Sequence, residues 1–303
     1  MATHDFEPTH FHPTIGSHEP VLHVAGGDTV KTWCVDAAGY DSTRERLAHG
    51  SNPQTGPFFV EGAEPGDTLA VRLDRIRPNR TRGVTGQVVA PHVVDPSFVP
   101  ELPARGYGDW WSLDLDRGTA RLEEPPPGLE SLGELTLDPM VGCFGVAPSG
   151  GQAISTATSG PHGGNMDYRG FRENVIVYFP VFVEGALFHI GDGHALQGDG
   201  EIVGTGIEVS MDVEFTVDVL KGKAISWPRA ENDEFVMAVG NARPLDQAVQ
   251  HATTELMHLL AEDHGLDYRA SSVLLGQCIR YDVGNVYDPA YTMVAKIAKE
   301  LLP

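Results

Sequence analysis

The sequence predicts a mainly β protein, with antiparallel sheets arranged as a sandwich or barrel and a smaller C-terminal part that combines α and β structure. The 35 glycines and 22 prolines are spread along all 303 residues. Short runs of alternating polar and apolar residues lie between them, which is the pattern of short strands joined by tight turns. Near the C-terminus the apolar spacing changes to three or four residues, which is typical of helices.

Three segments carry the strand pattern most clearly, at residues 29–36, 68–76 and 210–219, because polar and apolar side chains alternate there with a period of two. Shorter strands are expected at 21–24 and within 172–190. Helices are expected at 245–261 and 267–275. A last helix is expected from Pro289 or Ala290 to about Leu302, with Met293, Ile297 and Leu301 on one face.

Composition divides the chain into four parts that we expect to pack intimately rather than fold independently. Residues 1–20 form an extended N-terminal arm rich in histidine, 21–135 a β-rich N-terminal part, 136–230 a β-rich central part, and 231–303 an α+β C-terminal part. The motifs described below lie in the central part.

Charge and cysteine usage limit the class of function. Asp and Glu number 42 against 21 Lys and Arg, a net charge of −21. Nucleic acid is therefore not an expected partner, since phosphate binding needs clustered basic side chains, and neither is an anionic membrane. The three cysteines are widely separated. With no secretory leader expected and no apolar run near 18 residues, we expect a cytoplasmic protein.

The segment 191–201 concentrates ionisable side chains among four glycines. Asp192 and His194 are two residues apart, so on a strand both would project from the same face, and Asp199 and Glu201 repeat the spacing. Carboxylates with an imidazole suit zinc and related divalent metals, which activate water near neutral pH. The alternative is a glycine-rich turn in which the Asp side chains accept backbone hydrogen bonds.

A second constellation, at residues 160–167, offers His162, Asn165 and Asp167 beside two glycines. These residues could supply a substrate hydrogen bond and a further carboxylate ligand, or form a polar turn. Two isolated residues are weaker candidates that could equally start turns: Asp36, as a metal ligand, and Asn52, as a substrate-binding residue.

Nucleophilic catalysis is less favoured by the sequence. The Ser/Gly-rich residues 155–160 are similar to a segment of serine amidases, but those enzymes need a lysine to activate the serine. No lysine occurs between Lys31 and Lys221. Cys143 could be a nucleophile, although a lone small cysteine is more often a packing residue.

Several motifs in order resemble the acetamidase/formamidase family, over a region from about Leu22 to the C-terminus. The carriers are residues 55–67 (TGPFFVEGAEPGD), 162–167 (HGGNMD), 178–186 (YFPVFVEGA), 191–195 (GDGHA) and 197–201 (QGDGE). The resemblance implies hydrolysis of a small aliphatic amide to ammonia and a carboxylate, a divalent metal that is zinc by preference, and a homo-oligomer. Residues 87–133 match the family least well.

The resulting hypothesis assigns a role to each candidate. Asp167, Asp192 and His194, together with Asp36, hold the metal. Glu201 acts as general base and then general acid. Asn165, Gln197 and Asn52 bind the substrate. Two rivals stay open: a hydrolase of a lactam or other cyclic amide, and a non-catalytic module that binds calcium, against which His194 argues because calcium prefers oxygen ligands.

Overall fold

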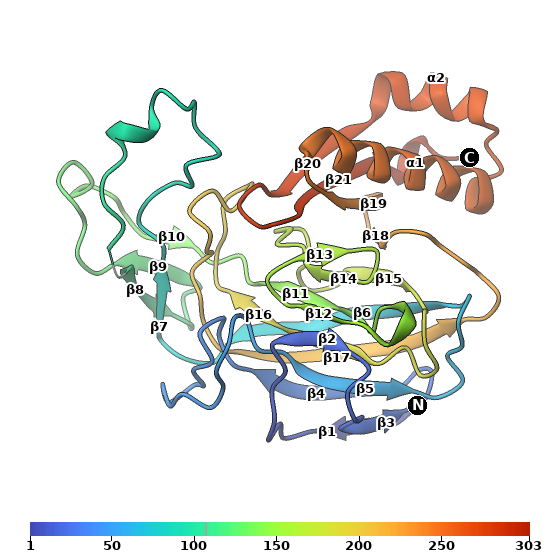
Figure 1. Ribbon diagram of the computed structural model, residues 1–303, viewed down its shortest axis with the longest axis horizontal. Coiled ribbons are helices and arrows are strands. Elements are labelled where there is room, and N and C mark those ends of the chain that lie inside the picture. Colours follow the sequence, from blue (N-terminus) through green and yellow to red (C-terminus); the bar gives the residue numbers. More distant parts are fainter. Residues whose placement is uncertain (107) are drawn as a thin grey trace.

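The computed structural model describes every residue of the chain except Tyr107. Its largest sheet has nine strands and extends from the N-terminal strands to the strands beside the C-terminal helices (Figure 1). Neighbouring strands are antiparallel except for the first pair, which is parallel. In sheet order the strands are β1 (Thr3–Asp5), β4 (Thr29–Cys34), β17 (Met211–Leu220), β6 (Thr68–Pro78), β15 (Ile176–Pro180), β18 (Arg229–Glu231), β19 (Phe235–Ala242), β21 (Tyr291–Ala298) and β20 (Arg280–Asn285).

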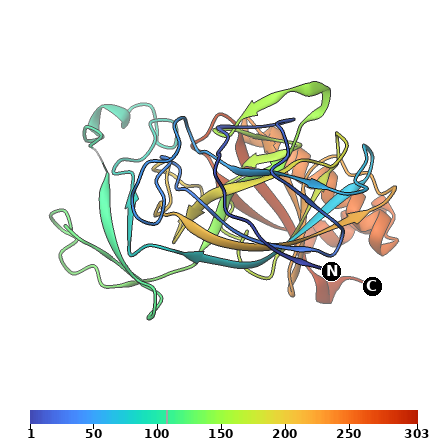
Figure 2. The ribbon, with the colours of Figure 1, turned by 90° about the horizontal axis from the view of Figure 1, so that it is seen from below.

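A second sheet of six strands packs against the first, and two small sheets complete the β structure. The six are β13 (Ser159–Gly160), β14 (Gly163–Asn165), β11 (Met140–Val146), β16 (Phe188–His194), β5 (Thr55–Val60) and β3 (Leu22–Val24). The small sheets are β10 (Leu135–Thr136), β9 (Thr119–Leu122), β8 (Asp109–Asp114) and β7 (Arg82–Thr85), and the pair β12 (Ala153–Ser155) and β2 (Thr14–Gly16). Figure 2 shows the sheet of β7–β10 projecting from one end.

Aromatic side chains fill the space between the two large sheets. Phe215 of β17 packs edge-on against Phe58 of β5 and Phe188 of β16, with ring centroids 5.2 and 5.1 Å apart. Phe144 of β11 meets Phe179 of β15 in the same way at 5.5 Å. All five rings are fully buried. Because such large side chains interdigitate, the two sheets are held in one relative position, and with them the loops at their edges.

The two expected helices before the last strands are confirmed. Helix α1 (Leu245–His264) covers β19 and β21, and Gly265 ends it in the left-handed conformation at φ 65°. Helix α2 (Tyr268–Cys278) begins at Asp267, whose side chain accepts a hydrogen bond from the backbone of Ala270. Three short 3-10 turns lie at η1 (Val99–Glu101), η2 (Ser149–Gly151) and η3 (Lys299–Leu301).

The expected last helix is wrong, because residues 291–298 form strand β21 between β19 and β20. Thr292, Met293, Val294 and Ala295 are buried in succession, so both faces of the segment are covered. A strand in the interior of a sheet tolerates such a continuous apolar run, and its periodicity cannot be told from that of a short buried helix. The fold class predicted from the sequence is nevertheless confirmed: mainly β with C-terminal helices.

Strands of the first twenty residues lie in the nine-stranded sheet, through β1 against β4, and in the two-stranded sheet, through β2 against β12. The strands of the largest sheet therefore come from residues 3–5 at one end of the sequence and 291–298 at the other. The division of the chain into four parts stays a prediction. No helix among the described residues is both long and apolar enough to cross a bilayer.

Histidines of the arm meet a buried histidine of β16. His12 stacks on His18 with centroids 4.0 Å apart, and His189 lies edge-on to both at 6.0 and 5.7 Å. Burial lowers the pKa of His189 to about 3 and that of His162 to about 4. Burial and the neighbouring His18 and His10 lower the pKa of His12 to about 4.

These histidines predict that acid destabilises the fold. In the unfolded chain a histidine binds a proton near pH 6.5, whereas these three bind it only near pH 3–4. Stability therefore falls as pH drops from about 6.5 to 4, by about 1.4 kcal/mol per pH unit for each of the two fully buried histidines, His162 and His189. We expect the His189→Gln variant to show a shallower dependence of the unfolding free energy on pH, measured by urea denaturation. The control is His49→Gln, which removes a histidine that is exposed in the folded protein. An unchanged slope in His189→Gln would contradict the prediction.

Candidate active site

The candidate site lies at the carboxyl end of β16, where the expected pair Asp192 and His194 is found. Every residue of this strand is buried, although His189, Asp192 and His194 carry ionisable side chains. The Oδ1 atom of Asp192 lies 3.3 Å from Nε2 of His194, so the two side chains do project together. Gly142 lies opposite on β11 and leaves room for the carboxylate of Asp192. A Cβ at Gly142 would lie 2.7 Å from Oδ2 of Asp192.

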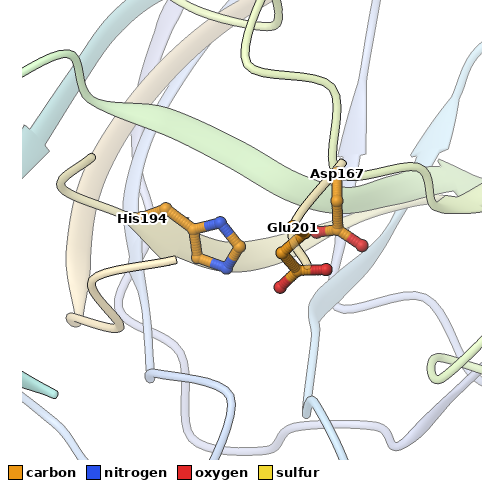
Figure 3. A group of neighbouring side chains, drawn as sticks. All are labelled: Asp167, His194 and Glu201. Atoms are coloured by element: carbon orange, nitrogen blue, oxygen red, sulfur yellow. The ribbon is translucent and has the colours of Figure 1, made fainter. Parts of the chain in front are cut away.

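Three further carboxylates converge on His194 from distant parts of the chain. Two groups of side chains each place their ligand atoms within 4.8 Å of one another: Asp167, His194 and Glu201 (Figure 3), and Asp192, His194 and Glu208. His194 belongs to both. The Oε1 atom of Glu208 lies 3.0 Å from its Nε2. The imidazole is therefore surrounded by four carboxylates.

The hydrogen bonds of Gln197 fix the orientation of the imidazole. Gln197 donates from Nε2 to the backbone carbonyl of Asp167 at 2.6 Å, so its Oε1 is left as an acceptor. That oxygen lies 2.8 Å from Nδ1 of His194, which must then carry the proton. In the neutral ring this leaves the lone pair on Nε2, the atom that faces the carboxylates. A histidine held in this way is typical of a metal ligand.

Four buried atoms at the centre of the cluster have no hydrogen-bond partner among the described residues: Oδ1 of Asp167, Oδ1 of Asp192, Nε2 of His194 and Oε2 of Glu208. Buried polar atoms are rarely left without a partner, because the desolvation penalty is then uncompensated. One nitrogen and several carboxylate oxygens are a donor set that suits a divalent transition metal. The residues present therefore fit a divalent cation.

The pKa directions of the clustered side chains are also those expected of a site that fits a cation. Burial, then the neighbouring carboxylates, raises the pKa of Asp167 well above its usual range, and burial does the same for Glu201. Burial also raises the pKa of Glu208 to about 7 and that of Asp288 to about 6. Although burial opposes its charge, Glu208 and Asp192 raise the pKa of His194 well above normal. In the part of the chain that the structure describes, no Lys or Arg forms an ion pair with these carboxylates. His194 is therefore the cationic side chain that the described residues place among these carboxylates.

Two asparagine amides bind the carboxylates from the side. Asn52 donates from Nδ2 to Oδ2 of Asp192 at 2.8 Å and to Oδ1 of Asn165 at 2.6 Å. Asn165 donates in turn to Oδ2 of Asp288 at 2.5 Å. The structure brings Asn52, Asn165 and Gln197 beside the cluster, with their amides hydrogen-bonded to its side chains. These amides hold the carboxylates and the imidazole in place, and their hydrogen-bonding groups are not free to bind a substrate.

Four site residues have left-handed backbone angles, which non-glycine residues adopt at a cost of about 1–3 kcal/mol each. The φ values are 51° at Asn52, 44° at Asp167, 62° at Asp192 and 47° at Glu201. Such angles persist only where the surrounding structure imposes them, and they cluster at functional sites. These backbone angles direct the four side chains toward the interior of the site.

Two expected residues are not part of the cluster. Asp36 is a correction: its Oδ2 accepts a 2.6 Å bond from the buried guanidinium of Arg80, and its Oδ1 accepts from the backbone of Ala38 and Tyr40. It closes a turn and has no free oxygen for a metal. The side chain of Asp199 is 66% exposed and pairs with Arg169. Strand β16 ends at His194, so the period-two spacing of Asp192 and His194 does not continue to Asp199 and Glu201.

Sequence reasoning missed Glu208, Asp288 and Asn285. Asn285 lies 3.3 Å from both Oδ2 of Asp167 and Oδ2 of Asp288. Glu208 precedes β17, and Asp288 precedes Pro289 in a turn after β20. Both look like ordinary polar residues at element ends, and only the pairing of distant strands brings them to His194. No signal in the sequence distinguishes them.

Fold and cluster together define a class of protein: a two-sheet β protein with a buried, carboxylate-rich centre built around one histidine. The sequence model of the Acetamidase/Formamidase family matches residues 145–249, which include most of this centre. The crystal structure of the acetamidase from Yersinia enterocolitica is 32% identical, with a TM-score of 0.84 and coverage of 99% of this chain and 92% of that one. The chain belongs to the acetamidase/formamidase family, which confirms the resemblance.

Three other proteins are similar to this chain. The predicted acetamidase/formamidase of Thermoanaerobacter tengcongensis is 29% identical, with a TM-score of 0.85 over 99% of this chain and 97% of that chain. The acetamidase of Mycolicibacterium smegmatis is 28% identical over 63% of this chain, which spans 58% of that protein's length. A gamma lactamase from Delftia acidovorans, at 20% identity and a TM-score of 0.58 over 96% of this chain and 90% of that one, shares the fold.

The position of Gly142 predicts that an added methyl group disrupts the cluster. A Cβ at this residue would lie 2.2 Å from Oδ1 of Asp167 and 2.7 Å from Oδ2 of Asp192. We expect Gly142→Ala to lower the unfolding free energy by about 1–3 kcal/mol and to weaken metal binding, measured by denaturation and by metal titration. Gly276→Ala, in open space on α2, should change neither property. Wild-type metal affinity in Gly142→Ala would show that this close contact does not position the two carboxylates.

Proposed function

We propose that this protein hydrolyses the carbon–nitrogen bond of a small linear amide to ammonia and a carboxylate, using a divalent metal that is zinc by preference. The observation that carries the proposal is the set of partnerless buried atoms around Nε2 of His194, in a chain of the acetamidase/formamidase family. The names of the relatives support the amide as substrate. The three cysteines, all free, support a cytoplasmic protein, and a homo-oligomer remains part of the proposal.

We assign the metal to His194 with Asp167 and Asp192, and Glu208 is the carboxylate that can join them. When bound, the cation supplies a positive charge that polarises the amide carbonyl and lowers the pKa of water into the neutral range. The protein's part is to hold its ligands in one geometry. Gln197 fixes the imidazole, Asn52 fixes Asp192, and Asn285 contacts Asp167.

We assign the proton transfers to Glu201. Glu201 is 6% exposed, and burial raises the pKa of its carboxyl group well above the usual range. A carboxyl group can take up a proton and return it, as a general base and then a general acid. In hydrolysis Glu201 would take the proton of the attacking water and then deliver it to the leaving nitrogen, so that ammonia departs as a neutral molecule. The closed environment prevents that proton from escaping to solvent between the two steps.

Replacing Glu201 by Gln tests this assignment. The amide keeps the shape of the side chain but cannot carry the proton, so we expect kcat for ammonia release to fall by about 10²–10⁴-fold. Bound metal, measured by elemental analysis, should be retained. The control is Asp199→Asn, since Asp199 is an exposed carboxylate two residues away that pairs only with Arg169 in the described structure. Its turnover should match the wild type.

The outcomes of this comparison separate two roles. Loss of metal together with turnover in Glu201→Gln would make Glu201 a ligand, in keeping with its place beside Asp167 and His194. Retained metal with near-wild-type turnover would remove Glu201 from the chemistry.

Removal and return of the metal test the need for a cation. We expect a chelator to abolish ammonia release from formamide and acetamide, and zinc to restore it while calcium does not, because a nitrogen ligand disfavours calcium. Circular dichroism should show that the fold survives chelation. Full activity in metal-free protein would refute metal dependence, and restoration by calcium alone would refute the choice of zinc.

A further inference from the structure

A cavity of about 360 Å³ reaches the candidate site at Glu208. Its walls come from the end of β7 and the loop after it, from residues 105, 106 and 108 before β8, from the turn after Glu201, and from Tyr287. The lining residues that the argument uses are Asp36, Gln87, Arg105, Thr205, Glu208 and Tyr287. Because Oε1 of Glu208 lies 3.0 Å from Nε2 of His194, a molecule in this cavity would approach the cluster from the Glu208 side.

The cavity is larger than formamide or acetamide requires. Pockets that enclose drug-sized ligands begin at about 300 Å³, whereas a single water molecule takes up about 30 Å³. Acetamide is only a few times larger than water. Most of the 360 Å³ would then be left unfilled, so the volume fits an amide with a longer acyl chain.

The charged side chains on the cavity wall indicate the chemistry of the substrate's acyl chain. Arg105 donates from Nη1 to the hydroxyl of Tyr287 at 2.9 Å, and its guanidinium lies over the same ring at 5.4 Å from the centroid. The ring packs against the backbone of Gly204, where an added Cβ would lie 2.3 Å from it. Arg105 is therefore positioned, through Tyr287, by the turn that contains Glu201 and Gly204.

The other charges of the cavity do not neutralise Arg105. The carboxylate of Asp36 is paired with Arg80, and Glu208 faces His194. Across the described residues, no carboxylate lies within ion-pair distance of Arg105. A guanidinium with free N–H groups on the wall of a cavity is suited to bind a carboxylate, which it can do through two parallel hydrogen bonds.

We propose that the substrate is an amide with a carboxylate at the far end of its acyl chain, a linear monoamide of a short dicarboxylic acid. Arg105 binds the carboxylate, and the amide group lies at Glu208 and His194. This assignment rests on the proposed amide hydrolysis, and makes Arg105 and Tyr287 the residues that determine specificity.

Three amides of graded charge and length test the proposal with ammonia release as the readout: succinamic acid, its neutral methyl ester, and acetamide. The wild type should prefer succinamate to its ester by at least tenfold in kcat/KM. In Arg105→Gln we expect kcat/KM for succinamate to fall about 10–100-fold, mainly through KM, because a hydrogen-bonded charge pair is lost. The fall in kcat/KM should be smaller for acetamide than for succinamate, because acetamide has no carboxylate for Arg105 to bind. Arg121→Gln, at an exposed arginine of β9, should behave as the wild type.

Succinate binding, measured by calorimetry, gives a readout that does not depend on turnover. Binding to the wild type with about tenfold or greater weakening in Arg105→Gln supports the carboxylate site even if none of the three amides is hydrolysed, in which case the proposed function fails instead. Equal loss of all three amides in Arg105→Gln, equal use of succinamate and its ester by the wild type, or succinate binding that is indifferent to Arg105 would each overturn the proposal while leaving amide hydrolysis standing.

Discussion

The constraint on which the structure depends is the burial of several carboxylates around a single imidazole. Asp167, Asp192, Glu201 and Glu208 lie around His194 in the interior, with no Lys or Arg paired to them among the described residues. Like charges in a low-dielectric interior repel strongly, so each must bind a proton, a hydrogen-bond donor or a cation. A centre of this kind costs stability, and its retention in a folded protein is most simply explained by a function that needs a cation there.

The surrounding structure maintains this unfavourable arrangement. Interlocked aromatic rings fix the two sheets, and left-handed backbone angles at Asn52, Asp167, Asp192 and Glu201 aim side chains toward one point. Amide side chains then complete the hydrogen bonding: Gln197 to the imidazole, Asn52 and Asn165 to the carboxylates. These supports leave the inner atoms partnerless and the Glu208 side accessible through the cavity. In the proposed function, the geometry that would hold a cation would also limit the direction from which an amide can approach.

Most of the local structure could be predicted because it depends on local pattern. The alternation in residues 210–219 gives β17 with its burial pattern, and the helical spacing after Pro244 gives α1. The prediction was wrong for residues 289–302, where an apolar run of helical spacing is a strand buried between two others. The pair Asp192 and His194 follows from period-two spacing on β16, whereas Asp36 was misplaced because its partner Arg80 is brought to it only by the fold.

By itself the sequence determined the β-rich class, the ionisable segment after β16 and the resemblance to a family, since each depends on residues close together or on motifs in order. Only the tertiary structure decided which carboxylates meet His194. Glu208 lies before β17 and Asp288 in the turn after β20, and they reach the site through pairings between strands far apart in the chain. The tertiary structure also decided that Asn52, Asn165 and Gln197 hydrogen-bond to side chains of the cluster. The physical reason is that ligand geometry and the neutralisation of buried charge are properties of side chains assembled in space, which spacing along one strand does not record.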